Sequence, residues 1–173
     1  MTTRRLAAEA GLNHGLVHYH FGSVEAVLAA VLDRALQRTL GRMRAALAGG
    51  APFRARWRAA MAALDAQVAG GDARLVAELS TAALHAPALR TRLAAAAEAW
   101  RALLAAALAD AVAEYGLSPA TAAPAAGLLG ALMAGMTAER VLEPGRDQGE
   151  LARWVEGWLL ALGDAGRGSP PTA

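Results

Sequence analysis

The residues best suited to chemistry lie in one short segment, residues 13–20, which reads Asn-His-Gly-Leu-Val-His-Tyr-His. Amide, imidazole and phenol groups donate hydrogen bonds to phosphate oxygens, as do the free N–H groups at a helix N-terminus. Leu16 could touch a thymine methyl group, and His14 and His18 could reach base edges. If the segment is a helix, its outward-facing residues would be His14, Gly15, Leu16, His18 and Tyr19, with His20 near its end. It therefore predicts a helix that reads a DNA groove.

The flanking sequence contains the elements that would position this helix. Thr2 or Thr3 can cap a short preceding helix, and Gly11 suits the left-handed backbone of a tight turn. Asn13 is a strong N-cap for the second helix. One apolar face of each helix would then pack inward, which is the organisation of a helix-turn-helix. The residues expected to face inward are Leu6, Ala7, Ala10, Leu12, Val17 and Phe21.

Residues 3–11, 16–23 and 25–28 together resemble the DNA-binding half of the tetracycline-repressor (TetR-type) family of bacterial regulators. The resemblance implies an N-terminal helix-turn-helix domain, followed by a helical domain that binds a small-molecule effector and dimerises. It also implies a ligand-responsive repressor that binds double-stranded DNA, at a near-palindromic operator, as a homodimer. Tyr19 and His20 would bind phosphate groups of the DNA backbone. The DNA contacts expected from motif position and outward placement are Thr3, Asn13, His14, Gly15, Leu16, His18, Tyr19 and His20.

Two positions depart from the family pattern. The family normally places a lysine at the start of the helix after the helix-turn-helix, where this chain has Val24. The family also has a further helix before the helix-turn-helix, whereas this sequence begins at Met1, directly before Thr2. Either the true start lies upstream of Met1, or the first helix of the DNA-binding domain is absent, as it is from this sequence. This leaves an alternative, a helical ligand-binding or dimer-partner protein that does not bind DNA because that helix is missing.

The composition favours an all-α fold and gives no support for catalysis. Hydrophobic residues make up 55% of the chain but aromatic residues only 5%, and alanine, which is abundant, favours helices. The absence of cysteine excludes disulfides and thiolate metal sites. No paired carboxylates, catalytic nucleophile or phosphate-binding glycine loop stands out. We expect a non-enzymatic cytoplasmic protein without a cofactor or metal, because nothing completes a zinc site around His14 and His18.

Charge is unevenly distributed along the chain. Residues 1–58 contain nine arginines and three acidic residues, a net charge of 9 − 3 = +6. Residues 59–173 contain eight arginines and twelve acidic residues, a net charge of 8 − 12 = −4. A basic N-terminal segment followed by an acidic one is expected if the basic segment binds phosphate. The asymmetry could also be a chance feature of a solvated surface.

Helical spacing and breaker residues divide the chain further. Helices are expected from Ser23 to about residue 48 and over residues 53–68, 73–85, 87–115, 119–142 and 148–162. We expect a helix-turn-helix domain over residues 1–46, an effector-binding and dimerisation domain over residues 47–163, and a disordered tail over residues 164–173. In the long helix after Ser23, the buried stripe would comprise Leu28, Val31, Leu32, Leu36, Leu40, Met43 and Leu47.

The C-terminal helices contain candidates for a ligand pocket. Tryptophan, methionine and a single histidine suit an adaptable, mostly apolar pocket, although each residue alone fits an ordinary core as well. The candidates are Met61, Leu64, Leu79, Leu84, His85, Trp100, Leu104, Met133 and Met136.

Residues 115–138 contain no charged residue over 24 positions. A membrane span is one interpretation, but alanine, glycine, threonine and proline make the segment only weakly apolar. We expect instead no membrane partner and close approach of another helix, as at a subunit interface. The candidate interface residues are Leu128, Ala131, Gly135, Trp154 and Trp158.

Overall fold

The structure is a computed structural model that describes residues 2–116, 118–143, 149–151 and 153–158. The described residues contain helices and no strand, which confirms the expected all-α fold. In chain order the helices are α1 (Thr3–Glu9), α2 (His14–Phe21), α3 (Val24–Leu47), α4 (Phe53–Ala69), α5 (Asp72–Ala82), α6 (Pro87–Tyr115), the 3-10 helix η1 (Pro119–Thr121) and α7 (Ala122–Leu142). Residues 149–151 and 153–158 are also helical. The expected tail over residues 164–173 lies outside the described residues.

Local signals in the sequence explain where several helices begin. The hydroxyl of Thr2 accepts a hydrogen bond from the N–H of Arg5, and Asn13 and Ser23 likewise cap α2 and α3. Each cap pairs a backbone N–H that would otherwise have no partner in the first helical turn. The helix-turn-helix therefore has its three starts set by short-range chemistry, as the sequence predicted.

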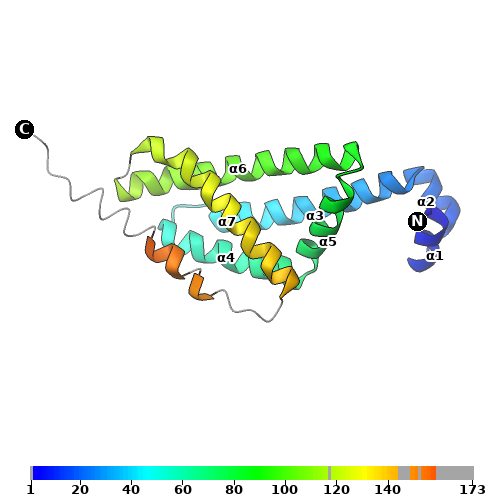
Figure 1. The fold of residues 1–173 in the computed structure, drawn as a ribbon, viewed down its shortest axis with the longest axis horizontal. Coiled ribbons are helices and arrows are strands. Elements are labelled where there is room, and N and C mark those ends of the chain that lie inside the picture. The colour runs from blue at the N-terminus through cyan, green and yellow to red at the C-terminus, as the bar shows by residue number, and fades with distance from the viewer. Residues whose placement is uncertain (1, 117, 144–148, 152, 159–173) are drawn as a thin grey trace, which may run out of the picture.

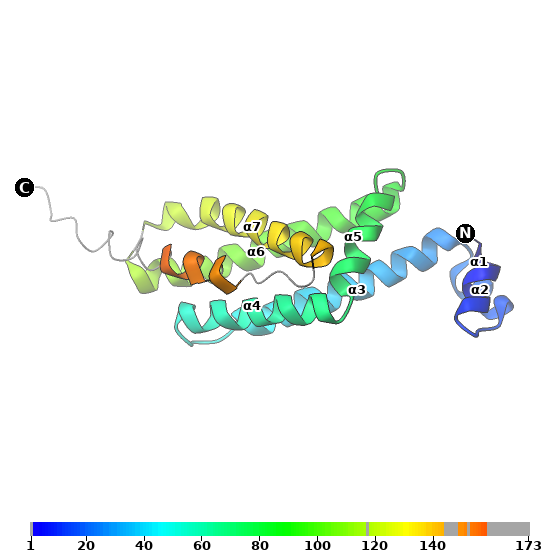
Figure 2. The same ribbon diagram turned by 60° about the horizontal axis from the view of Figure 1, so that its bottom comes forward.

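The long helix α3 connects two parts of the molecule (Figure 1). Its beginning carries α1 and α2 at one end of the protein, and the rest of α3 runs through the helical body. Within the body, α3, α4, α6 and α7 enclose a main core that includes Met43, Trp57, Leu104 and Met133. Figure 2 shows α5 crossing between α4 and α6. There α5 helps α3 and α6 to form a smaller core around Leu32.

The apolar stripe of α3 serves more than one purpose. Leu32, Met43 and Leu47 are buried as predicted, whereas Val31 is exposed, contrary to the prediction. Val31 lies at the edge of the face that packs on α5 and α6, so only part of the stripe has a helix above it. Leu36 and Leu40 are half-buried because they face a cavity described below.

Asp72 joins α5 to α3 through two arginines. Arg38 Nε lies 3.2 Å from each carboxylate oxygen of Asp72, and Arg42 Nη1 lies 3.0 Å from Oδ2. Arg38 and Arg42 are one helical turn apart on α3, so both guanidinium groups reach the same buried carboxylate. Gly71 occupies the N-cap position of α5, and Asp72, the first residue of the helix, makes this tertiary contact. We call these three residues the Asp72 clamp.

Helix α7 has an apolar composition and an exposed face. Among the described residues it is the one unbroken helix whose length and hydropathy would suffice to cross a membrane, a property that core helices of soluble proteins share. Only 22% of its most apolar window is buried inside the chain. One face of α7 packs in the main core through Met133 and Met136, and the neighbouring face lines the cavity.

Replacement of the Asp72 carboxylate by an amide tests the clamp. Asp72→Asn should lower the free energy of unfolding by about 1.5–3 kcal/mol at neutral pH, because charge-assisted hydrogen bonds are lost. Hydrogen bonds from Arg38 hold the pKa of Asp72 below its ordinary value, although burial acts in the opposite direction. The stabilisation is therefore complete above about pH 5 and is lost as the pH falls below about 4. Urea unfolding of both proteins across this range measures the difference.

Glu78→Gln is the matched control, because Glu78 forms an exposed ion pair with Arg74 on the same helix. This variant should change the free energy of unfolding by less than about 0.5 kcal/mol. An Asp72→Asn variant as stable as the Glu78→Gln variant would show that the clamp contributes little.

Candidate functional site

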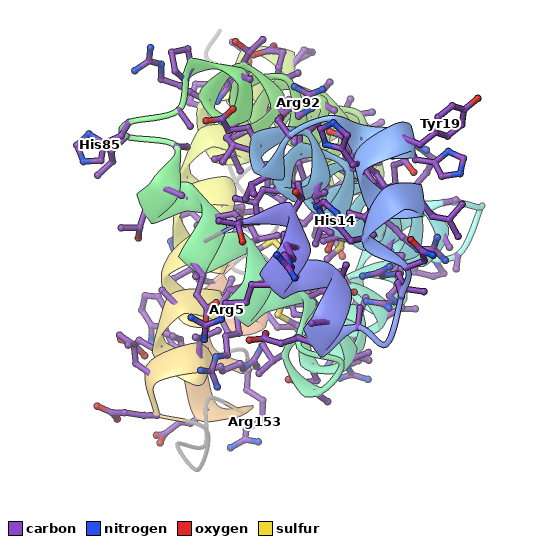
Figure 3. All side chains as sticks on the ribbon, turned by 90° about the vertical axis from the view of Figure 1, so that its right-hand side faces the viewer. Arg5, His14, Tyr19, His85, Arg92 and Arg153 are labelled. Atoms are coloured by element: carbon purple, nitrogen blue, oxygen red, sulfur yellow. The ribbon has the colours of Figure 1, made fainter. Side chains whose placement is uncertain are left out.

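The helix-turn-helix projects from the body at the beginning of α3. Helix α1 packs on α2, and α2 packs on α3. Gly11, between the two short helices, has a φ of +66°, which is the left-handed backbone expected at this turn. The outer side of α2 therefore remains open to a partner (Figure 3).

The outer face of α2 presents the predicted side chains to solvent. Tyr19 is 82% exposed and projects away from every helix (Figure 3). Val17, on the opposite face, is buried as expected. Except for the half-buried Thr3, the expected DNA contacts are all exposed, namely Asn13, His14, Gly15, Leu16, His18, Tyr19 and His20. The structure thus brings the predicted set together on one surface.

Polar contacts organise this surface. Asn13 Oδ1 accepts a hydrogen bond of 2.7 Å from the N–H of Gly15, and Thr3 Oγ1 lies 3.3 Å from His14 Nε2. The rings of His14 and His18 stack with centroids 6.1 Å apart. These contacts place a hydroxyl and two imidazoles side by side, an arrangement suited to phosphate oxygens and base edges. No group of three histidine, aspartate or glutamate side chains that could hold a metal occurs in the described part of the chain.

Three apolar residues of the helix-turn-helix do not pack as predicted, and the first, Ala10, is exposed directly after α1. Leu12, expected to fill the turn, is 59% exposed, and Phe21, expected to face inward, is 39% exposed. The reason is the number of packing surfaces: α1, α2 and the first turns of α3 cover Ala7 and Val17 but leave the other side of the turn without a neighbour.

Most arginines of the basic segment, residues 1–58, form ion pairs within the protein. Six of the segment's nine arginines do so, namely Arg5, Arg38, Arg42, Arg54, Arg56 and Arg58. Five of these six lie on α3 and α4 and pair with acidic residues from later in the chain. The charge asymmetry along the sequence therefore reflects internal pairing as much as a surface for phosphate.

The body contains a cavity of about 620 Å³ between α3, α4, α5, α6 and α7. Alanine and glycine line much of it, including Ala97, Ala134 and Gly130. Small side chains on facing helices leave the space unfilled. Its polar wall residues are Thr39, Gln67, Ser80, Arg101 and Thr137.

The structure places the sequence-predicted pocket residues in three environments. Leu64 and Met133 belong to the main core and also line the cavity, and Trp100 lines the cavity while packing against that core. Met61, Leu104 and Met136 pack in the main core, and Leu79 packs in the smaller core. Leu84 and His85 are exposed in the turn between α5 and α6, where His85 points away from the body (Figure 3). The sequence analysis selected large apolar residues, most of which pack in cores. It missed Thr39 and Gln67, because neither residue stands out in an alanine-rich helix.

The predicted interface residues divide similarly. Leu128, Ala131 and Gly135 lie on the exposed face of α7, and Trp154 is 67% exposed. Trp158 instead packs against the main core beside the buried Val155. Glu156 pairs with Arg54 and Arg58 of α4. Burial alone would raise the pKa of Glu156, but hydrogen bonds from Arg58 and Arg54 together bring it below its ordinary value.

Comparison with known proteins agrees with this geometry. Residues 1–31 match the family model described as bacterial regulatory proteins, tetR family. The N-terminal segment therefore has the sequence pattern of the TetR family. The match covers α1, α2 and the beginning of α3, which are the elements of the projecting helix-turn-helix.

The body shares its fold with a solved structure. A crystal structure of a protein assigned as a transcriptional regulator from Pseudomonas aeruginosa PAO1 superposes with a TM-score of 0.82 at 22% identity, over 96% of this chain and 81% of the other. No curated protein matches the sequence. The chain therefore shares the fold of that protein, and its N-terminal segment matches the tetR family of regulators.

The N-cap of α2 can be tested separately from DNA binding. Asn13→Ala should lower the free energy of unfolding by about 1 kcal/mol, because the N–H of Gly15 loses its acceptor. Asn13→Asp should retain the wild-type value, since aspartate caps helices as well as asparagine does. Hydrogen exchange at Gly15, measured by NMR, reports the cap directly. Equal exchange rates in the alanine and aspartate variants would contradict this role of Asn13.

Proposed function

We propose that this protein is a TetR-family, ligand-responsive repressor that binds a near-palindromic operator as a homodimer. In this proposal α2 enters the major groove, and a small molecule in the central cavity lowers affinity for the operator. The observation that carries it is the outer face of α2, where hydrogen-bonding side chains from Thr3 to His20 are gathered on one projecting surface.

The chemistry of that face supports different roles for different residues. Tyr19 and His20 lie at the end of α2, where they would donate to phosphate oxygens on the edge of the groove. His14 and Leu16 lie in the first turns, the part of a recognition helix that meets base edges. The N-terminus of α2 would add its partial positive charge beside the DNA backbone.

Helix α3 supplies a physical connection between cavity and DNA. Leu36, Thr39 and Leu40 of α3 line the cavity, and the beginning of the same helix packs against α2. A ligand that preferred one position of α3 would change the separation of the two recognition helices in a dimer. The coupling free energy between ligand binding and DNA binding could be no larger than the ligand's preference for that position of α3.

Fluorescence anisotropy of the purified chain on DNA flanking its own gene, over a salt series, tests the proposal. Affinity should be sequence-selective and should fall steeply as salt rises, because phosphate contacts release counterions. Tyr19→Phe should weaken binding to all sequences by about tenfold, since a hydrogen bond to a charged group is lost.

His14→Ala and Leu16→Ala should instead change which sequences are preferred. The same effect from all three variants would contradict the division into phosphate and base contacts. Val31→Ala serves as a control, because Val31 is exposed on α3 outside the proposed DNA surface.

The exposed face of α7 supports self-association. Leu128, Ala131, Gly135, Ala138 and Leu142 recur at spacings of three and four and are all exposed, so they form one uncharged stripe, of which Ala131 and Ala138 also border the cavity. Small residues flanked by leucines let two helices approach closely, and such a stripe on a soluble protein marks an interaction surface. We assign a second copy of the chain as its partner, with the exposed Trp154 as a further candidate contact.

Leu128→Arg tests this interface. An arginine in the centre of the stripe should weaken self-association at least tenfold, because a charge would be buried without a partner. Sedimentation equilibrium measures the change. Leu84→Arg is the matched control, since Leu84 is an exposed leucine in the turn between α5 and α6. Equal association of the two variants would place the interface elsewhere.

The exposure of Leu12 and Phe21 favours a second candidate, a dimer partner without affinity for DNA. In this case the apolar side of the turn would leave the helix-turn-helix too weakly supported to hold α2 against a groove. Absence of DNA binding, with self-association retained, would favour this candidate over the repressor.

A further inference from the structure

The central cavity is apolar apart from a few polar groups, and their hydrogen bonding differs. The hydroxyls of Ser80 and Thr137 donate to the carbonyls of Val76 and Met133, four residues earlier in their own helices, at 2.7 and 2.8 Å. These two hydroxyls already have an acceptor. Gln67 and Thr39 do not follow this pattern.

Gln67 is buried without a hydrogen-bond partner among the described residues. Its side chain lies on the cavity wall contributed by α4 and is 8% exposed. Its amide nitrogen and oxygen keep some accessible surface on the cavity side, where an amide can both donate and accept hydrogen bonds. A ligand in the cavity would supply the missing partner.

The hydroxyl of Thr39 is also unpaired. Its Oγ1 is buried and has no hydrogen-bond partner within the described part of the chain. Other helical hydroxyls, such as those of Thr81 and Thr91, donate to the carbonyl four residues earlier. Thr39 lies on the α3 side of the cavity, and its hydroxyl oxygen is covered by protein, so rotation of the side chain would be needed to present the hydroxyl to a ligand beside Gln67.

The described wall offers an ion little counter-charge. Among the described residues no acidic side chain lines the cavity, and the one charged wall residue, Arg101, is exposed and already paired with Glu98. An ionised ligand group would lose its hydration without gaining an opposite charge. A neutral group that both donates and accepts would match an amide and a hydroxyl.

We infer that the cavity binds an uncharged, mainly apolar molecule carrying one neutral hydrogen-bonding group, such as an amide or alcohol, that pairs with Gln67 and Thr39. The inference deepens the proposed function, since it names the chemical class of the effector. It rests on that function only for the ligand's effect on DNA, because binding itself follows from the cavity.

Three probes with the same hydrocarbon chain test the class: decanamide, decanoate and the decylammonium ion. Calorimetric titration of the full chain, below the concentration at which any probe forms micelles, gives the three affinities. Decanamide should bind at least tenfold more tightly than either ion. An ion that binds as tightly as the amide, or no binding by any probe, would overturn the inference.

Gln67→Leu locates the polar contact. This variant should lose about tenfold in decanamide affinity, as expected for a buried hydrogen bond to a neutral group. Its melting temperature should not fall, since the wild-type amide has no partner to lose. Gln37→Leu is the matched control, because Gln37 is exposed on α3 and does not line the cavity. Equal decanamide affinities in the two variants would overturn the role of Gln67.

Thr39→Val provides an independent measurement, because valine keeps the shape and removes the hydroxyl. Decanamide affinity should fall severalfold while the melting temperature is unchanged or higher. A lower melting temperature with unchanged affinity would show that the hydroxyl serves the fold and not a ligand. DNA anisotropy on the same samples separates the two proposals: amide-selective binding without DNA binding would overturn the regulator and leave the ligand class standing.

Discussion

The rest of the structure depends on how α3 is held. This one helix carries the helix-turn-helix at its beginning, contributes to both cores and supplies one wall of the cavity. The Asp72 clamp fixes it to α5, and Arg92 of α6 pairs with its Asp33 at 3.0 Å. Because these ion pairs are directional and short, they define the position of α3 more closely than apolar packing alone would.

The cavity and the clamp occupy the same region of the molecule. Asp72 begins α5, and the next residue, Ala73, already lies on the cavity wall. On α3, Arg38 of the clamp is followed directly by Thr39 of the cavity. A molecule in the cavity would therefore touch the two helices that the clamp joins. In this arrangement a modest change in packing around the cavity would change the position of α3, and α3 contacts the projecting helix α2.

Small residues give this protein both its cavity and its open face. Alanines and glycines allow α6 and α7 to pack closely at one end and leave space between them elsewhere. On α7 the cavity wall and the exposed stripe overlap, since Ala131 and Ala138 belong to both. The alanine-rich composition thus accounts for helices that pack tightly without filling the interior, because an alanine side chain contributes little volume.

The sequence by itself determined the helices, their caps and the outward set on α2, because these depend on contacts within a few residues. Thr2, Asn13 and Ser23 cap the helices that the pattern predicted, and α6 begins and ends at the predicted residues. Only the tertiary structure decided which large apolar residues border a cavity and which fill a core. It also decided that Asp72 meets Arg38, that Leu12 is exposed, and that Gln67 is buried without a partner. These outcomes depend on which helices lie opposite one another, and a periodic apolar face does not specify its neighbour.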